Sequence, residues 1–145
     1  MKYIINKDTL YIIFNGNTTI INENGLEMEF VGNYVKKILD DSCIYYGSSL
    51  KGRIKGVKNI LNISYKVPIM ISEKRKIVLF PLSGLKNNEI ILINFDVIKE
   101  YYNVDNFINV VFKGDFEKKF MCSRTIFNNQ INKCSRLLWI YENNR

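Results

Sequence analysis

Serines, glycines and cations gather at the start of one predicted helix, where their chemistry suits contact with phosphate. Gly47 precedes two serines, and an amphipathic run follows them. The apolar positions of that run, at helical spacing, are Leu50, Ile54, Val57 and Leu61. A serine at such a start accepts a hydrogen bond from a first-turn N–H, and the start offers N–H groups and partial positive charge to a phosphate. The candidate DNA-contacting residues here are Ser48, Ser49, Lys51, Gly52, Arg53, Lys55 and Lys58.

The cations and glycines of this helix are predicted to lie on two flanks. At about 100° per residue, the lysines gather on one flank, and the glycines Gly52 and Gly56 fall on the other with Arg53 beside them. A glycine inside a helix costs roughly 1 kcal/mol relative to alanine, but it lets a protein or phosphodiester backbone come close. The alternative is an ordinary surface helix, with solvated lysines and with glycines that serve close packing.

Short strands surround this helix. The Asn24-Gly25 pair is the strongest hairpin signal in the chain, and Lys113-Gly114-Asp115 predicts a second hairpin turn. The segment Phe95–Tyr102 fits a short helix or the end of a strand. The predicted strands are Tyr3–Ile5, Leu10–Phe14, Thr18–Asn22, Leu26–Phe30, Val67–Ser72, Ile77–Phe80, Glu89–Asn94, Phe107–Phe112 and Phe116–Cys122.

Two further helices are predicted, one over Tyr34–Asp41 and one that begins near Ser123. We therefore expect an α+β fold, an antiparallel strand meander or half barrel with a two-helix insert in the middle and a C-terminal helix. Trp139 and Ile140 fall off the apolar stripe of the last helix. Large apolar residues in such a place often mark an interface, which is weak evidence for self-association.

A second basic group lies on a predicted hairpin tip. Glu73-Lys74-Arg75-Lys76 is a charged turn between two strands, and Lys66 lies just before the first of them. Arginine inserted into a narrow AT-rich minor groove reads its width, so Lys66, Lys74 and Arg75 are candidate DNA-binding residues. A solvated turn explains the same residues.

Two other pairs have two interpretations each. Tyr45 and Tyr46 could stack on bases or ribose, or wedge between base steps. A tyrosine pair at an element junction is more often core with one exposed hydroxyl. Asp40 and Asp41 could form a metal or general-base site. We favour a solvated helix end, because no partner ligands are recognisable.

Composition limits the classes of function. The chain has 145 residues, 47% of them hydrophobic, which predicts one domain spanning residues 1–145 with a real core. Its 21 basic and 14 acidic residues give a net charge of +7, which suits nucleic acid or an anionic membrane, although an AT-rich genome also favours lysine codons. With no histidine, Ser-His and Cys-His catalysis and histidine-ligated zinc are excluded.

The cysteines and the first residues indicate the compartment. Cys43, Cys122 and Cys134 are far apart without a Cys-x-x-Cys pair, so we expect free buried thiols in a reducing cytoplasm. The first residues are too polar for a signal peptide, and no apolar run is long enough to span a membrane. We expect a cytoplasmic protein that is no enzyme and has no catalytic residue, metal site or cofactor.

A family resemblance adds to these observations. The string Tyr45-Tyr46-Gly47-Ser48-Ser49-Leu50-Lys51-Gly52-Arg53, then Lys66–Ser72, then Phe80-Pro81, resembles the core signature of the competence transcription factor (ComK) family. The segment Ile5–Ile12 is similar to the family's amino-terminal strands. The resemblance implies a cytoplasmic activator that binds AT-rich DNA through the minor groove, as an oligomer on paired AT boxes.

The chain also departs from the family pattern. The family's threonine-containing turn after the Phe-Pro pair reads Leu82-Ser83-Gly84 here, and its aromatic strand reads Ile91–Asn94. Longer members continue into a C-terminal tail linked to activation and to capture by a proteolytic adaptor, and no match to that tail is found. The expectation is a protein that binds DNA yet activates weakly, competes for sites, or escapes that degradation route.

We therefore expect a regulator of competence genes whose partners are double-stranded DNA and further copies of itself, with RNA polymerase as a candidate partner. In this mechanism the lysines neutralise phosphates, the Gly47–Gly52 segment sets the register, and Arg53 with Arg75 reads the groove width. The alternative is a basic half-barrel module that binds anionic lipid or a protein partner without DNA.

Overall fold

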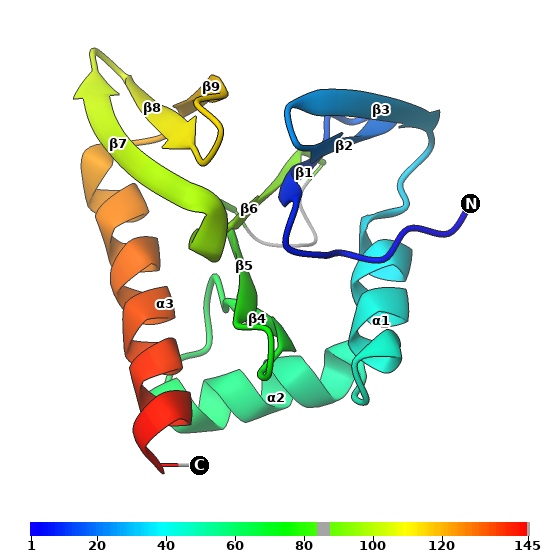
Figure 1. Ribbon diagram of the computed structural model, residues 1–145. Helices are drawn as coiled ribbons and strands as arrows, with labels where there is room; N and C mark the ends of the chain where they lie inside the picture. Colours follow the sequence, from blue (N-terminus) through cyan, green and yellow to red (C-terminus); the bar gives the residue numbers. More distant parts are fainter. Residues whose placement is uncertain (84–87, 145) are drawn as a thin grey trace.

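The computed structural model describes residues 1–83 and 88–144, so Gly84 of the expected family turn lies outside the described residues. Within these described residues, nine strands and three α-helices follow one another (Figure 1). The elements are β1 (Thr9–Phe14), β2 (Thr18–Glu23), β3 (Leu26–Val31), α1 (Val35–Tyr45), α2 (Leu50–Leu61), β4 (Ile69–Ser72), β5 (Ile77–Pro81), β6 (Ile90–Asn94), the 3-10 turn η1 (Phe95–Val97), β7 (Ile98–Val104), β8 (Phe107–Phe112), β9 (Glu117–Met121) and α3 (Arg124–Asn144).

Six strands form the larger sheet, in the order β3-β2-β1-β6-β5-β4, and neighbouring strands are antiparallel. Asn24 and Gly25 turn β2 into β3 with φ of 55° and 92°, because both central residues of a tight hairpin turn need positive φ. Tyr11 faces Ile93 across the β1–β6 pair, which joins the two hairpin halves of the sheet. The two-helix segment lies between β3 and β4, outside the sheet.

The smaller sheet has the order β7-β8-β9, and its ring side chains pack onto the larger one. The Tyr11 ring centroid lies 6.0 Å from that of Phe112 and 5.7 Å from that of Phe120, the latter edge-on. Two hydrogen bonds also fix the Tyr11 hydroxyl: it donates to Glu27 and accepts from Asn22 Nδ2 at 3.1 Å. Tyr11 therefore connects the two sheets through an aromatic cluster.

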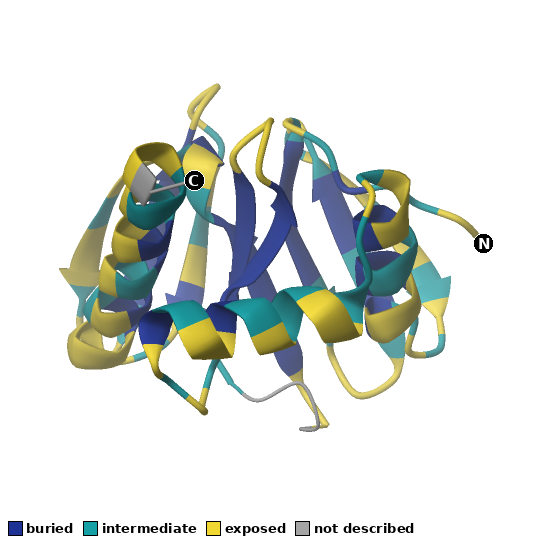
Figure 2. Cartoon of the chain, turned by 90° about the horizontal axis from the view of Figure 1, so that it is seen from below, coloured by how far each residue is buried: buried dark blue, intermediate teal, exposed yellow. Residues whose placement is uncertain are grey.

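The helices enclose the sheet from three sides. Seen from below, α2 crosses the molecule between α1 and α3, with buried strands behind it (Figure 2). Ile38 and Leu39 of α1 belong to one buried cluster, and Phe127 of α3, edge-on to Phe80 at 5.6 Å, belongs to the other. Because α2 packs Val57 and Leu61 inward, its opposite face is left exposed.

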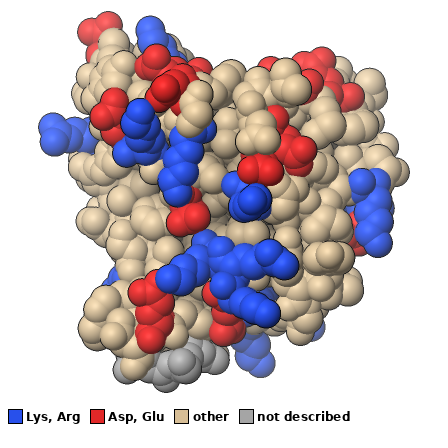
Figure 3. Space-filling view, viewed as in Figure 1, with Lys and Arg blue, Asp and Glu red and all other residues tan. Residues whose placement is uncertain are grey.

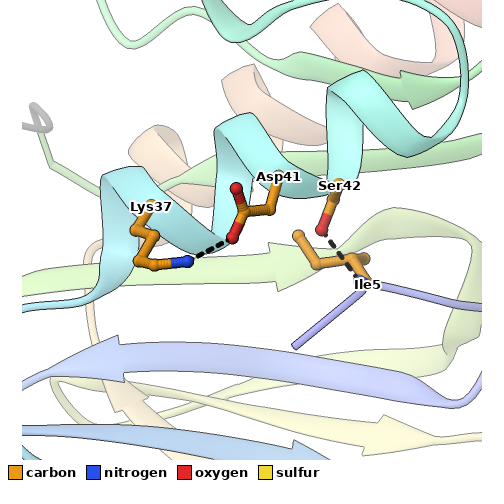
Figure 4. A network of polar contacts seen from close by, with 4 residues as sticks. All are labelled: Ile5, Lys37, Asp41 and Ser42. Atoms are coloured by element: carbon orange, nitrogen blue, oxygen red, sulfur yellow. Dashed lines mark hydrogen bonds and ion pairs between the residues drawn. The ribbon is translucent and has the colours of Figure 1, made fainter. Parts of the chain in front are cut away.

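The predicted class is confirmed: an α+β fold with antiparallel strands, two helices in the middle and a C-terminal helix. The predicted strand Tyr3–Ile5 is wrong. The backbone of Ile5 bonds instead to side chains of α1 and of the residue just after it. Its N–H donates to Ser42 Oγ at 2.9 Å (Figure 4), and its carbonyl accepts from the Tyr46 hydroxyl at 2.9 Å. Phe95–Tyr102 contains both alternatives, a 3-10 turn followed by a strand.

Candidate nucleic-acid interface

The start of α2 is capped by two side chains of the protein itself. The Ser49 hydroxyl accepts from the Gly52 N–H at 3.0 Å, as the sequence predicted for a serine at this place. Asp40 of α1 accepts from the Leu50 N–H at 2.9 Å. Asp40 therefore caps α2 and is not a solvated helix end. The Leu50 and Gly52 N–H groups are already bonded within the protein, so fewer N–H groups at this terminus are left for a phosphate.

Lysines occupy one exposed flank of α2, as the spacing predicted. Lys51, Lys55 and Lys58 are all exposed, and none forms an ion pair within the described residues. The buried side of the helix, through Val57 and Leu61, holds the flank in place against the core. Three unpaired ammonium groups on one rigid element can neutralise phosphates that follow the helix axis.

The two glycines of α2 leave an open strip beside the lysines. A Cβ added at Gly56 would meet nothing within 4 Å, and one at Gly52 would meet only the Ser49 and Ser48 hydroxyls, at 3.1 and 3.6 Å. The alternative that these glycines serve close packing inside the chain finds no support here. The strip instead lets an outside backbone approach the helix.

Arg53 lies on the other flank and is held by the β4–β5 turn. Its Nη1 donates to Glu73 Oε1 at 2.9 Å, its side chain is 13% exposed, and its buried Nε has no hydrogen-bond partner among the described residues. Arg53 is therefore separated from the lysines, and its guanidinium is shared with a carboxylate. Its predicted role in reading a groove stays a prediction.

The turn after β4 presents the other predicted cations. Lys74 and Arg75 are exposed and form no ion pair within the described part of the chain, whereas Lys76 bonds Glu142 of α3 at 2.8 Å. That pairing raises the pKa of Lys76. Figure 3 shows basic side chains gathered around this hairpin, with acidic ones at the margin of the group. Because Glu73 and Lys76 are paired, Lys74 and Arg75 are the free cations of the turn.

Lys66 lies apart from the other candidates, beyond the far end of α2. Its backbone has φ of 49°, and its carbonyl accepts from Gln130 Nε2 of α3 at 3.0 Å. Its Nζ lies 5.4 Å from the centre of the Tyr65 ring, a cation–π contact. The structure therefore does not bring Lys66 together with Ser48, Ser49 and the other residues at the start of α2.

Of the two interpretations of the tyrosine pair, core packing fits Tyr46 and an exposed contact surface fits Tyr45. Tyr46 is half-buried, and burial raises the pKa of its hydroxyl, which donates to the Ile5 carbonyl. Tyr45 is 68% exposed, and its ring stands edge-on to that of Tyr46 at 5.0 Å. Tyr45 is therefore available to a partner. The exposed Lys7, which the local sequence does not connect with the tyrosines, lines the same cleft.

No group of three or more His, Cys, Asp or Glu side chains among the described residues could hold a metal ion, and Asp41 pairs with Lys37 at 2.6 Å (Figure 4). Within the described chain, no helix combines the length and apolar character needed to cross a bilayer. Cys43 and Cys134 are free and buried, and burial raises the pKa of the Cys43 thiol to about 11.

Comparison with known proteins places the chain in a family. No solved structure matches it. The competence transcription factor of Bacillus subtilis (strain 168) is 29% identical over 102 residues, which cover 70% of this chain and 53% of that protein. The chain thus spans about half the length of this curated relative in the match. A family model described as ComK protein matches residues 1–145, and the chain therefore belongs to the ComK protein family.

Proposed function

We propose that this protein is a transcription regulator of competence genes that binds AT-rich duplex DNA through the minor groove. Family membership and the competence transcription factor relative support the biological role. The structural observation that carries DNA binding is the exposed flank of α2, where Lys51, Lys55 and Lys58 are unpaired beside an open glycine strip.

In this mechanism the α2 flank supplies affinity. Its three ammonium groups displace counterions from the duplex, which makes binding depend strongly on salt concentration. Gly52 and Gly56 allow the phosphodiester backbone to approach the helix, and the hydroxyls of Ser48 and Ser49 can donate their protons to phosphate oxygens. Such contacts set the register of the protein on DNA but do not read sequence.

Preference for AT-rich DNA is assigned to the arginines. Arg75, which forms no ion pair among the described residues, presents its guanidinium on the exposed turn between β4 and β5, next to Lys74. A narrow AT-rich minor groove has an enhanced negative potential, which favours an inserted arginine. Arg53 is paired with Glu73 of the same turn. It contributes in one of two ways: its guanidinium exchanges the Glu73 carboxylate for DNA, or the pair holds the turn in position. Lys66 adds a more distant phosphate contact.

The test is fluorescence anisotropy of the purified protein on matched AT-rich and GC-rich duplexes across a salt series. We expect tight, salt-sensitive binding with a clear preference for the AT-rich duplex. Weak binding that is indifferent to sequence would contradict the proposal and would assign the excess of lysine to codon bias.

The second candidate is a module that binds anionic lipid or a protein partner without DNA. The free cations Lys74 and Arg75 at an exposed turn favour it, because juxtamembrane basic groups bind anionic headgroups. Co-sedimentation with vesicles of phosphatidylserine and phosphatidylcholine separates the two functions. The DNA proposal expects the protein to stay in the supernatant at the salt concentration where it binds duplex.

A further inference from the structure

A cleft lies between the end of α1, the loop before β1 and the β4–β5 turn. Its volume is about 680 Å³. Two tyrosines and three cations line it, together with an amide and a carboxylate: Tyr45, Tyr46, Lys7, Lys74, Arg75, Asn6 and Asp96. Four segments far apart in the sequence meet here, since Asp96 comes from η1, so the cleft exists only in the folded protein.

One wall of the cleft is aromatic and fixed. The Tyr46 hydroxyl donates to the Ile5 carbonyl at 2.9 Å, so this ring is held against the loop before β1. Tyr45 packs edge-on against Tyr46 at an interplanar angle of 89° and leaves 68% of its own surface exposed. An exposed ring held by a fixed neighbour gives a sugar or a base a flat surface at small entropic cost.

The charges in the cleft favour an anion. Lys7, Lys74 and Arg75 are exposed cations that form no ion pair within the described residues. The carboxylate of Asp96 opposes them, so three positive groups against one negative group leave a net charge of +2. Arg75 and Tyr46 line the same cleft, and burial raises the pKa of the Tyr46 hydroxyl while the Arg75 charge lowers it.

The segments that carry these cations are fixed before any ligand arrives. Asn6 holds the loop around Lys7, since its side chain donates to the Ile4 carbonyl and to Glu23 Oε1, at 3.1 and 3.0 Å. On the other side, the Arg53–Glu73 pair fixes the turn to α2 and the Lys76–Glu142 pair fixes it to α3. A site whose groups are already positioned loses less entropy when it binds.

We propose that this cleft holds the sugar-phosphate backbone of one DNA strand, with Lys7, Lys74 and Arg75 on phosphate oxygens and the Tyr45 ring against a deoxyribose. The inference rests on the proposed function, and it adds Tyr45 and Lys7 to the interface. The cations come from two separate segments of the cleft lining, Lys7 from the loop before β1 and Lys74 with Arg75 from the β4–β5 turn, which fits a ligand with more than one charge such as a DNA strand. Ser48 and Ser49 follow the tyrosines after Gly47, so the strand continues toward the start of α2.

The test combines protein variants with a duplex in which single phosphates are replaced in turn by neutral methylphosphonates. We expect Tyr45→Ala to weaken binding of the AT-rich duplex about tenfold, Tyr45→Phe to leave it unchanged, and Lys7→Gln to weaken it about fivefold. A methylphosphonate at the phosphate that Lys7 contacts should weaken binding by the parent protein. Lys7→Gln lacks that contact, so it should bind the substituted and the unsubstituted duplex with equal affinity. The charge-matched control is Lys119→Gln on β9, at the opposite end of the molecule from α2 (Figure 1).

The possible results separate this inference from the proposed function. If the parent binds the duplex and both Tyr45→Ala and Lys7→Gln bind it equally well, the cleft is not part of the interface and the proposed function stands. If the parent does not bind duplex DNA, the proposed function fails and the inference fails with it. Thermal unfolding of each variant, with an unchanged midpoint, establishes that lost affinity reflects a lost contact.

Discussion

Arg53 of α2 donates from Nη1 to Glu73 Oε1 at 2.9 Å, and this pair joins the helix to the β4–β5 turn. The contact links the two predicted groups of DNA-binding cations, which lie on different elements. It also means that a substitution at either residue changes both the charge and the position of the turn.

Arg53→Ala should lower affinity for AT-rich duplex and reduce the preference for AT-rich over GC-rich DNA, because it removes a cation proposed to read the groove. Glu73→Gln frees the guanidinium but also releases the turn, so it separates the two roles: preserved affinity and preference favour Arg53 on DNA, and reduced affinity favours Arg53 as the residue that holds the turn. Anisotropy titrations on matched duplexes compare the three proteins. Equal affinity and equal preference for Arg53→Ala and the parent would exclude this role for Arg53.

Lys55→Ala should weaken binding to every duplex and flatten the dependence of log affinity on log salt by about one unit, since one phosphate contact is lost. The ratio of AT-rich to GC-rich affinity should not change. Lys119→Ala on β9 removes the same charge outside the interface and should keep the parent slope. A Lys55→Ala slope identical to that of the parent argues against a phosphate contact at this residue.

Gly56→Ala should stabilise the protein by up to about 1 kcal/mol while it weakens DNA binding. The added Cβ meets nothing within 4 Å, so the helix gains alanine's propensity at no steric cost. A DNA backbone at the glycine strip would meet that methyl group. Urea unfolding and anisotropy give the two readouts, and Gly52→Ala, whose Cβ lies 3.1 Å from the capping Ser49 hydroxyl, should gain less stability. A stabilised variant with parental affinity would show that no backbone approaches the strip.

Alkaline pH should destabilise the fold through Cys43. Burial raises the pKa of this thiol from 9.0 to about 11, so the folded state keeps a proton that the unfolded state loses. The stability that the protonated Cys43 thiol contributes is complete below about pH 9 and is lost as the pH rises toward about 11. Burial also raises the pKa values of Tyr3 and Tyr11, which act in the same direction at higher pH.

Urea unfolding between about pH 8 and pH 10.5 measures this effect. Cys43→Ala should be less stable at neutral pH, because a buried side chain is shortened, and should lose less stability as pH rises. Equal pH slopes for Cys43→Ala and the parent would assign the alkaline loss to other groups.

Trp139 is the residue to test for self-association, which remains a prediction. It is 60% exposed on α3 and is the one tryptophan of the chain. If copies associate through it, its fluorescence should shift to shorter wavelength as concentration rises, and Trp139→Gln should sediment as a smaller species. Met121→Gln, which changes an apolar residue on β9 that is even more exposed, is the control. Unchanged sedimentation of Trp139→Gln would place any interface elsewhere.

Local chemistry made several features predictable from the sequence. Asn24-Gly25 determines a tight hairpin because both residues tolerate positive φ, and Ser49 caps α2 because its side chain reaches the Gly52 N–H within one turn. Helical spacing alone placed the lysines of α2 on one exposed flank. Interactions of this kind involve neighbours in the chain, so their partners are visible in the sequence.

Tertiary structure decided what depends on distant partners. The amino-terminal segment is not a strand, because Ser42 and Tyr46 supply its hydrogen bonds. Arg53 is paired because β4 brings Glu73 beside α2, and Lys7 shares a cleft with Tyr45 because the loop before β1 packs on α1. Periodicity reports which face of an element is buried but not which element covers it. The sequence therefore determined the cations and the helix that carries them, whereas the fold decided which of them are free to meet a partner.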